Sequence, residues 1–120
     1  MRCVIVDDSM LIRRILTSIL RGWRDIEVLE AADARTALLL CQAGVDLLVT
    51  DWNMPEMSGL ELIREIRSRA EFNETRILVV TSRNGRADVV EASTSGADGY
   101  IVKPFTQAIV RSQLDSLFPA

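Results

Sequence analysis

Five polar residues with complementary chemistry stand directly after short apolar runs of this sequence. Asp7 and Asp8 follow the first run, Asp51 follows a later one, and Thr81 and Lys103 end two more stretches of this kind. Carboxylates that are brought together repel one another, and the repulsion is relieved by uptake of a proton or by a cation. If the chain gathers these side chains, it forms an acidic site that also contains a hydroxyl and an ammonium group.

The oxygen-only set of potential ligands predicts a site for a hard divalent cation. Mg²⁺ suits one or two carboxylates, a carbonyl group and waters, and it commonly bridges to a phosphate; Mn²⁺ is the alternative ion. We expect Asp8 and Asp51 as direct ligands and Asp7 to act through water or by supporting them. Asn53, two residues past Asp51, is placed to offer its backbone carbonyl.

The same residue types fit phosphoryl transfer to a carboxylate. A carboxylate can attack phosphorus to give an acyl phosphate, and the transfer chiefly requires neutralisation of the charge on the equatorial oxygens. The metal ion would neutralise one oxygen, Lys103 a second, and the Thr81 hydroxyl with nearby backbone N–H groups the third. The predicted chemistry is therefore acceptance of a phosphoryl group.

The elements that must position these residues alternate regularly along the chain. Brief apolar runs, most of them rich in branched residues as strands are, cover residues 3–6, 26–29, 45–49, 77–80 and 100–102. Segments with helical spacing or helix-compatible composition cover residues 12–19, 31–41, 60–66, 87–95 and 106–118. This alternation predicts an α/β fold with a doubly wound, five-stranded parallel sheet. Since the carboxyl ends of parallel strands share one edge, the five polar residues are expected to converge there.

Composition excludes several other classes of function. The 120 residues suffice for one domain, and the net charge of −3 with a pI near 4.9 argues against a nucleic-acid binder. The lack of histidine excludes Ser-His-Asp nucleophile systems and histidine-ligated zinc. No apolar run reaches the length of a signal peptide or membrane span, so we expect a cytoplasmic protein without membrane insertion. Cys3 and Cys41 lack any metal-binding pattern and are expected to be buried, reduced thiols.

Five spaced motifs resemble the response-regulator receiver family, and within it the stand-alone chemotaxis regulators. They follow the family's order across nearly the whole chain, and they are Val6-Asp7-Asp8-Ser9, Asp51-Trp52-Asn53-Met54-Pro55, Met57-Ser58-Gly59-Leu60-Glu61-Leu62, Val80-Thr81-Ser82 and Gly99-Tyr100-Ile101-Val102-Lys103-Pro104-Phe105. The resemblance implies that residues 1–120 form one receiver domain. It also implies the strand order 2-1-3-4-5 known from flavodoxin-like folds.

The resemblance assigns a role to each residue of the predicted site. It implies that Asp51 is the phospho-acceptor, that Thr81 senses the phosphoryl group and that Lys103 binds it; the metal ligands match those expected above. Tyr100 corresponds to an aromatic residue that swings inward when Thr81 moves, and the Lys103-Pro104 bond is expected to be cis. Phosphorylation would then shift a two-state equilibrium.

The implied partners are those of a signalling protein. A histidine kinase or a phosphotransfer domain would be the phosphodonor, and the domain would catalyse only its own phosphorylation and dephosphorylation. An output protein would bind the face made by the fourth helix, fifth strand and fifth helix, and the chemotaxis resemblance points to the flagellar motor switch. Because the sequence stops soon after its last predicted helix, we expect action through binding. The alternatives are a phosphorelay shuttle or a receiver cut from a longer regulator or hybrid kinase.

One residue departs from the chemotaxis pattern. Arg83 stands two residues after Thr81, where chemotaxis members typically have an acid. In the family, this position and that of Asn53 tune the hydrolysis of the acyl phosphate. Our hypothesis is that Arg83 alters the rate of dephosphorylation without affecting phosphorylation.

An aspartyl-phosphate phosphatase of the haloacid-dehalogenase type is the rival from another class. Such an enzyme needs D-x-D-x-T after its first strand, whereas this chain has Asp7-Asp8-Ser9-Met10 there. A degenerate receiver that serves only as an interaction surface is a third reading, although every chemical position is intact. Trp52 is interpreted as a partly covered neighbour of the site, and Arg13 and Arg14 as a solvated helix face.

Overall fold

The computed structural model describes residues 1–119 and shows strands and helices in strict alternation. The described residues also contain one 3₁₀ turn, η1, between α3 and β4. In chain order the elements are β1 (Arg2–Val6), α1 (Met10–Trp23), β2 (Glu27–Ala31), α2 (Ala34–Cys41), β3 (Leu47–Thr50), α3 (Gly59–Arg67), η1 (Ala70–Phe72), β4 (Arg76–Thr81), α4 (Arg86–Ser95), β5 (Gly99–Val102) and α5 (Gln107–Leu117).

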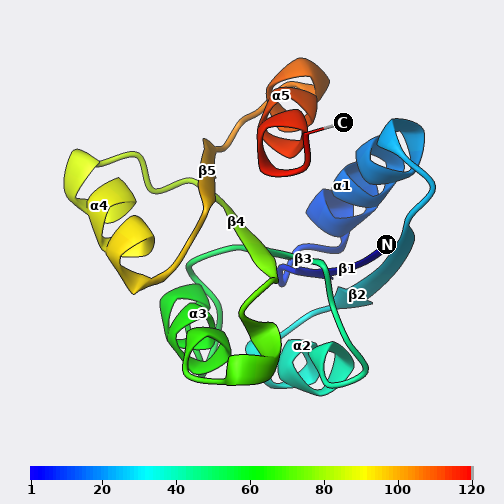
Figure 1. Cartoon of the computed structure of the whole chain (residues 1–120). Coiled ribbons are helices and arrows are strands. Elements are labelled where there is room, and N and C mark those ends of the chain that lie inside the picture. Colours follow the sequence, from blue (N-terminus) through cyan, green and yellow to red (C-terminus); the bar gives the residue numbers. More distant parts are fainter. Residues whose placement is uncertain (120) are drawn as a thin grey trace.

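The five strands form one parallel sheet in the order β2-β1-β3-β4-β5, as predicted (Figure 1). Almost every residue of β1, β3 and β4 is buried, because helices cover both faces of these inner strands. The chain reverses its winding direction between β1 and β3. At such a switch point the loops that follow the two strands diverge and leave room for a site.

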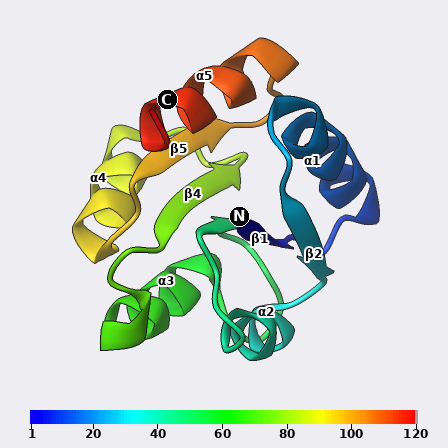
Figure 2. The same ribbon diagram turned by 45° about the vertical axis from the view of Figure 1, so that its right-hand side comes forward.

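Helices α1 and α5 cover one face of the sheet, and α2, α3 and α4 cover the other (Figures 1 and 2). Each face has its own apolar core, since alternate residues of a strand point to opposite sides. Along β1, Cys3 and Ile5 pack toward α1 and α5, whereas Val4 and Val6 pack toward α2 and α3. This alternation fixes the register in which the strands pair. The register in turn decides where each strand ends along the carboxyl edge of the sheet.

Side-chain caps set the starting points of most helices. Ser9, Asp33 and Thr106 each accept a hydrogen bond from a backbone N–H in the first turn of α1, α2 and α5. At α3, Ser58 and Glu61 form a reciprocal capping box. Helix α4 lacks such a cap and buries Ala92 as its one fully covered residue, so it is the most loosely packed helix of residues 1–119.

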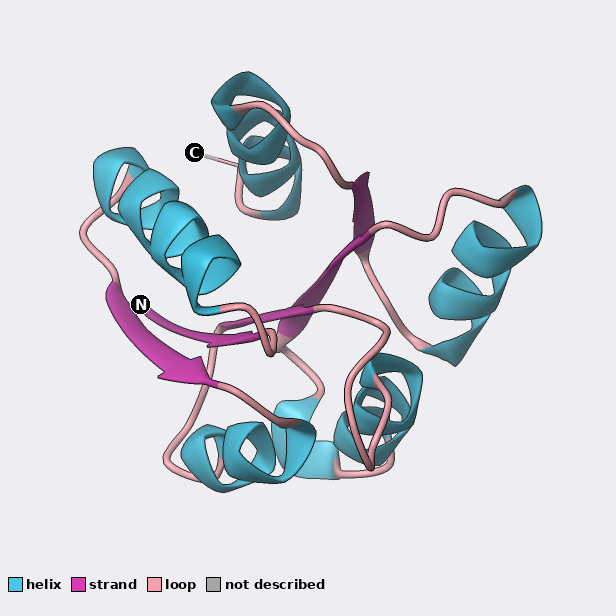
Figure 3. Cartoon of the chain, turned by 180° about the vertical axis from the view of Figure 1, so that it is seen from behind, coloured by secondary structure: helices cyan, strands magenta, loops and turns pink. Residues whose placement is uncertain are grey.

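The predicted elements are confirmed, with corrections at several ends (Figure 3). The third strand begins at Leu47 rather than at residue 45, and the second helix begins at Ala34 rather than at residue 31. Ala31 is instead the last residue of β2, where it accepts a hydrogen bond from the backbone N–H of Asp7. The Lys103-Pro104 bond is cis, as expected. In the described part of the chain, no helix is both long and apolar enough to cross a membrane.

Candidate functional site

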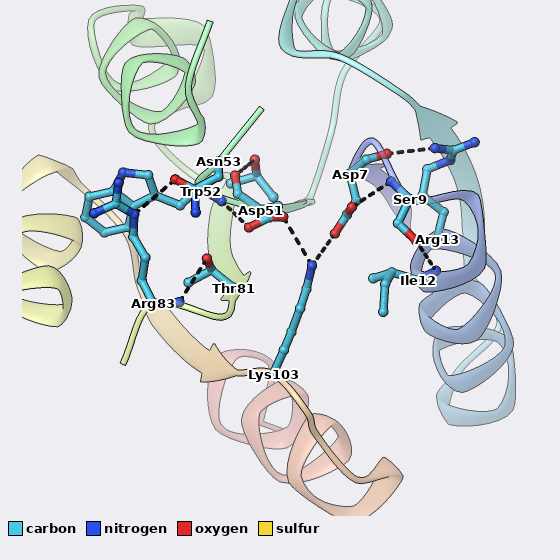
Figure 4. Close-up of polar contacts among 11 residues, drawn as sticks. Asp7, Ser9, Ile12, Arg13, Asp51, Trp52, Asn53, Thr81, Arg83 and Lys103 are labelled. Carbon is cyan, nitrogen blue, oxygen red and sulfur yellow. Dashed lines mark hydrogen bonds and ion pairs between the residues drawn. The ribbon is translucent and has the colours of Figure 1, made fainter. Parts of the chain in front are cut away.

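The five polar residues singled out in the sequence lie at the carboxyl edge of the sheet. Figure 4 shows Asp7, Asp51, Thr81 and Lys103 there. Asp7 and Asp8 follow β1, Asp51 follows β3, Thr81 ends β4 and Lys103 follows β5. These four strands lie side by side in the sheet in the order β1-β3-β4-β5. The parallel topology therefore brings four widely separated segments of the sequence into one cluster.

Three carboxylates of this cluster could hold a metal ion. Asp7, Asp8 and Asp51 each offer an oxygen, and these oxygens lie within 4.8 Å of one another. Asp7 and Asp51 are buried, while Asp8 is exposed. An all-oxygen site that is open on one side fits Mg²⁺, which keeps several of its waters when it binds protein. The donor set therefore suits the predicted ion.

Lys103 connects two of the three carboxylates. Its Nζ donates to Asp7 Oδ2 over 2.8 Å and to Asp51 Oδ2 over 3.1 Å. Burial favours the neutral amine, but the hydrogen bond to Asp7 and the charge of Asp51 outweigh it and raise the pKa of Lys103 above its ordinary value. Lys103 is also the only lysine of the chain. The site thus contains a fixed cation that balances part of its negative charge.

Asp7 is held from several directions at once. Its Oδ1 accepts from the backbone N–H of Ser9 over 2.9 Å, and its Oδ2 accepts from Lys103. Burial raises the pKa of Asp7 above its ordinary value, and the nearby charge of Asp51 acts in the same direction. The hydrogen bonds from Lys103 and Ser9 partly oppose this effect, since they stabilise the carboxylate.

Asp51 is fixed by its own loop. Its Oδ1 accepts from the backbone N–H of Trp52 over 2.6 Å, and its carbonyl accepts from the Thr50 hydroxyl over 2.8 Å. Gly59 passes close behind, because its N–H donates to the carbonyl of Trp52 over 2.8 Å. A Cβ at position 59 would lie 1.9 Å from the Asp51 carbonyl oxygen. Glycine is thus required at position 59 by the close approach of α3 to the site.

The loop after β4 joins Thr81 to Tyr100. Thr81 Oγ1 accepts from the backbone N–H of Arg83 over 3.4 Å, and the carbonyl of Arg83 accepts from the Tyr100 hydroxyl over 2.8 Å. Burial and the charge of Asp88 raise the pKa of the tyrosine. The backbone of Arg83 therefore connects Thr81 at the end of β4 with the aromatic ring on β5.

The Arg83 side chain closes one side of the site. Its guanidinium group stacks over Trp52 at 4.7 Å from the ring centroid, and its Nε donates to Asn53 Oδ1 over 3.1 Å. The other end of the group pairs with Asp88 on α4 over 3.3 Å. Trp52 borders the site as interpreted from the sequence, but with 6% exposure it is buried and not partly covered. Arg83 thus links the Asp51 loop to the first turn of α4.

The interpretation of Arg13 and Arg14 as a solvated helix face is correct for Arg14 and wrong for Arg13. The side chain of Arg14 is 68% exposed, whereas that of Arg13 is 14% exposed. Arg13 donates to the carbonyl of Asp7 over 2.7 Å and pairs with Glu30 over 3.1 Å. The partner on β2 lies 17 residues further along the chain, so no local sequence signal distinguished the two arginines.

Comparison with known proteins identifies the family and the fold of the chain. The profile of the response regulator receiver domain matches residues 3–115. The chain is a member of the response regulator receiver family. This receiver domain is 41% identical to chemotaxis protein CheY-3 of Vibrio cholerae over 98% of the chain and 92% of the relative. It is 39% identical to chemotaxis protein CheY of Pseudomonas aeruginosa, with coverages of 98% and 96%.

Solved structures agree with this assignment. The receiver domain superimposes on chemotaxis protein CheY4 of Vibrio cholerae with a TM-score of 0.90 and 32% identity, covering 98% of both chains. The family and its strand order are therefore as the motifs predicted, and the chain is a CheY-like two-component receiver. The phosphatase interpretation is not favoured.

Proposed function

We propose that Asp51 of this receiver accepts a phosphoryl group with the help of Mg²⁺. The observation that carries the proposal is the cluster of three carboxylates around the single lysine, with Lys103 Nζ within 3.1 Å of both Asp7 and Asp51. Asp51 sits at the centre of this cluster, at the end of the middle strand. Its carboxylate is the one that has an ammonium group, a hydroxyl on the neighbouring strand and two further acids around it.

The transfer step uses groups that are already in place. An oxygen of Asp51 attacks the phosphorus of the donor, the bond from phosphorus to the donor atom breaks, and the donor leaves with that electron pair and takes up a proton. Lys103 neutralises one equatorial oxygen, and the Thr81 hydroxyl donates to another. Mg²⁺ held by Asp7, Asp8, Asp51 and the carbonyl of Asn53 would supply positive charge to the third oxygen.

The donor would be a histidine kinase or a phosphotransfer domain. Because the carboxylate is both the nucleophile and the group that is modified, the domain would act on itself alone, and its acyl phosphate would be lost to water in a later self-catalysed step. Asn53 and Arg83 border the cluster from the same side and are hydrogen-bonded to each other. We include in the proposal that this pair sets the rate of that loss.

An output protein would detect phosphorylation at the face formed by α4, β5 and α5. Thr81, the backbone of Arg83 and Tyr100 form a continuous path from the site to this face. Tyr100 lines a cavity of about 330 Å³ between α4, β5 and α5, together with Val89 and Gln113. The same three elements carry exposed apolar side chains, Val90 on α4, Val102 on β5 and Ile109 on α5. An output protein, with the flagellar motor switch as the candidate from the chemotaxis relatives, would bind there.

Mass spectrometry after incubation with Mg²⁺ and acetyl phosphate tests the proposed acceptor. The wild type should gain one phosphoryl group per chain, and Asp51→Asn should gain none. Asp25→Asn, which changes an exposed acid of the loop after α1, is the matched control and should behave as the wild type. Modification of Asp51→Asn to the same extent, or turnover of many equivalents of phosphoester, would refute the assignment.

The decay of the acyl phosphate tests the role of Arg83. Arg83→Glu should be phosphorylated at the wild-type rate and should then lose the group at a different rate, measured after removal of the donor. Arg86→Glu introduces the same charge change at an exposed residue of α4 and serves as control. Equal decay of wild type and Arg83→Glu would reject the hypothesis.

A further inference from the structure

Asp8 is the carboxylate of the cluster whose own side chain is least constrained. Asp7 is held by Lys103 and Ser9, and Asp51 is held by Lys103 and the N–H of Trp52. Asp8, by contrast, is exposed, and no hydrogen bond between residues 1 and 119 reaches its carboxylate. Its position therefore depends on the backbone that carries it.

The backbone before Asp8 is held by hydrogen bonds from two elements, β2 and α1. The N–H of Asp7 donates to the carbonyl of Ala31 over 3.2 Å, and the carbonyl of Asp7 accepts from Arg13 over 2.7 Å (Figure 4). That carbonyl belongs to the peptide that joins Asp7 to Asp8. Because a peptide group is planar, fixing the direction of its C=O bond also fixes the direction in which the next Cα lies. Arg13 thus controls the orientation of Asp8 without contacting its carboxylate.

Arg13 is itself held by Glu30. The Nε of Arg13 pairs with Glu30 Oε1 over 3.1 Å, and both side chains are largely covered, with exposures of 14% and 27%. Glu30 lies next to Ala31 at the end of β2, so β2 supports Asp7 directly through a carbonyl and indirectly through this ion pair. The carboxylate of Glu30 also offsets the charge of Arg13, which would otherwise repel a divalent cation a short distance away.

We propose that Arg13 is a positioning residue for the metal site. With Glu30 it fixes the Asp7–Asp8 peptide so that the exposed Asp8 carboxylate faces Asp7 and Asp51 before a cation binds. The inference rests on the metal site proposed above and adds to it a residue that is neither a ligand nor a contact of the phosphoryl group. Groups that orient metal ligands typically contribute ten- to a hundredfold in metal affinity.

A role through charge and a role through positioning predict opposite effects of Arg13→Ala on the affinity for Mg²⁺, so the variant distinguishes between them. If Arg13 acted only through its charge, its removal would lower the repulsion of a cation and tighten the binding of Mg²⁺. If it positions Asp8, the same change weakens binding, and we expect about a tenfold loss. Calorimetric titration of the unphosphorylated protein with Mg²⁺ measures this affinity without any phosphoryl transfer.

Two further variants separate the positioning role of Arg13 from the effect of its charge and from an effect on folding. Arg13→Lys keeps the charge, but an ammonium group lacks the planar fork that reaches Glu30 and the Asp7 carbonyl together, so binding should again weaken. Arg14→Ala removes an adjacent, exposed guanidinium whose Nε lies 3.7 Å from the other oxygen of Glu30. It should bind Mg²⁺ as well as the wild type or slightly better. Should Arg13→Ala fail to fold, as judged by circular dichroism, the lysine variant carries the test.

The outcomes distinguish this inference from the proposed function beneath it. Wild-type affinity or tighter binding in Arg13→Lys or Arg13→Ala overturns the positioning role and leaves the metal site intact. A loss of affinity in Arg14→Ala equal to that in Arg13→Ala also overturns it, because the loss would then come from something that both arginines share, such as their approach to Glu30, and not from the hydrogen bond of Arg13 to the Asp7 carbonyl. Absence of Mg²⁺ binding by the wild type overturns the metal site and this inference together.

Discussion

Replacing Lys103 by methionine removes the one cation that lies between Asp7 and Asp51 and keeps a side chain of similar length. At an effective dielectric constant near 20, each of the two attractions in the wild type amounts to about 5 kcal/mol before the cost of desolvation. In the variant the two carboxylates, whose oxygens lie within 4.8 Å of each other, would repel by about 3.5 kcal/mol. We therefore expect the metal-free variant to lose about 3 kcal/mol of unfolding free energy in mildly alkaline solution, where both acids are ionised.

The repulsion between the two carboxylates can be relieved in two ways, and each should make the loss of unfolding free energy smaller. Proton uptake is one: the repulsion favours the neutral form of Asp7 and raises its pKa further, in the same direction as the burial that already raises it. A carboxyl group with a raised pKa binds more protons folded than unfolded, so stability increases as the pH falls through that pKa. The loss caused by Lys103→Met should therefore shrink from about pH 8 to about pH 5. Saturating Mg²⁺ is the other way, and it should shrink the loss at every pH.

Urea unfolding followed by circular dichroism measures these differences, with and without a chelator. Arg111→Met removes an exposed positive charge from α5 and serves as the matched control, with an expected change of less than about 0.5 kcal/mol. The reasoning is refuted if Lys103→Met loses the same free energy in chelator as in saturating Mg²⁺ and the same at both pH values. Such a result would mean that the methylene chain, rather than the charge, stabilises this edge of the sheet.

Three further changes test other parts of the structure. Gly59→Ala places a methyl group against the Asp51 carbonyl and should cost about 1–3 kcal/mol on urea unfolding; wild-type stability would show that this loop yields freely. Tyr100→Phe removes the hydrogen bond to the loop after β4 and should cost about 1 kcal/mol in the unphosphorylated protein, a claim that an unchanged denaturation midpoint would contradict. Burial raises the pKa of Cys41 to about 11, and that of the buried Cys3 also rises, so in the folded protein both thiols should react with iodoacetamide near pH 8 far more slowly than a free thiol, with urea-unfolded protein as the reference.

Much of the site could be predicted because its residues are defined by where strands end. Asp7, Asp51, Thr81 and Lys103 end or follow short apolar runs whose length and branched residues favour strands, and a parallel sheet has a single carboxyl edge. The spacing of Ser58 and Glu61 also matches a capping box, which the structure contains. Element ends were less accurate, since Ala31 fits a strand or a helix equally well by composition.

The α/β class, the edge of the sheet that carries the polar cluster, and the acids, hydroxyl and amine of that cluster all follow from the order of residues in the chain. Those features follow from local periodicity and from the order of the elements. Which charged side chains meet depends on the three-dimensional packing. Arg13 and Arg14 are the same residue type at neighbouring positions, yet Arg13 is covered and donates to the Asp7 carbonyl, whereas Arg14 stays largely exposed and only approaches Glu30. The difference arises from the packing of α1 against β2, because a residue's direction around a helix is fixed only when its neighbours in space are fixed.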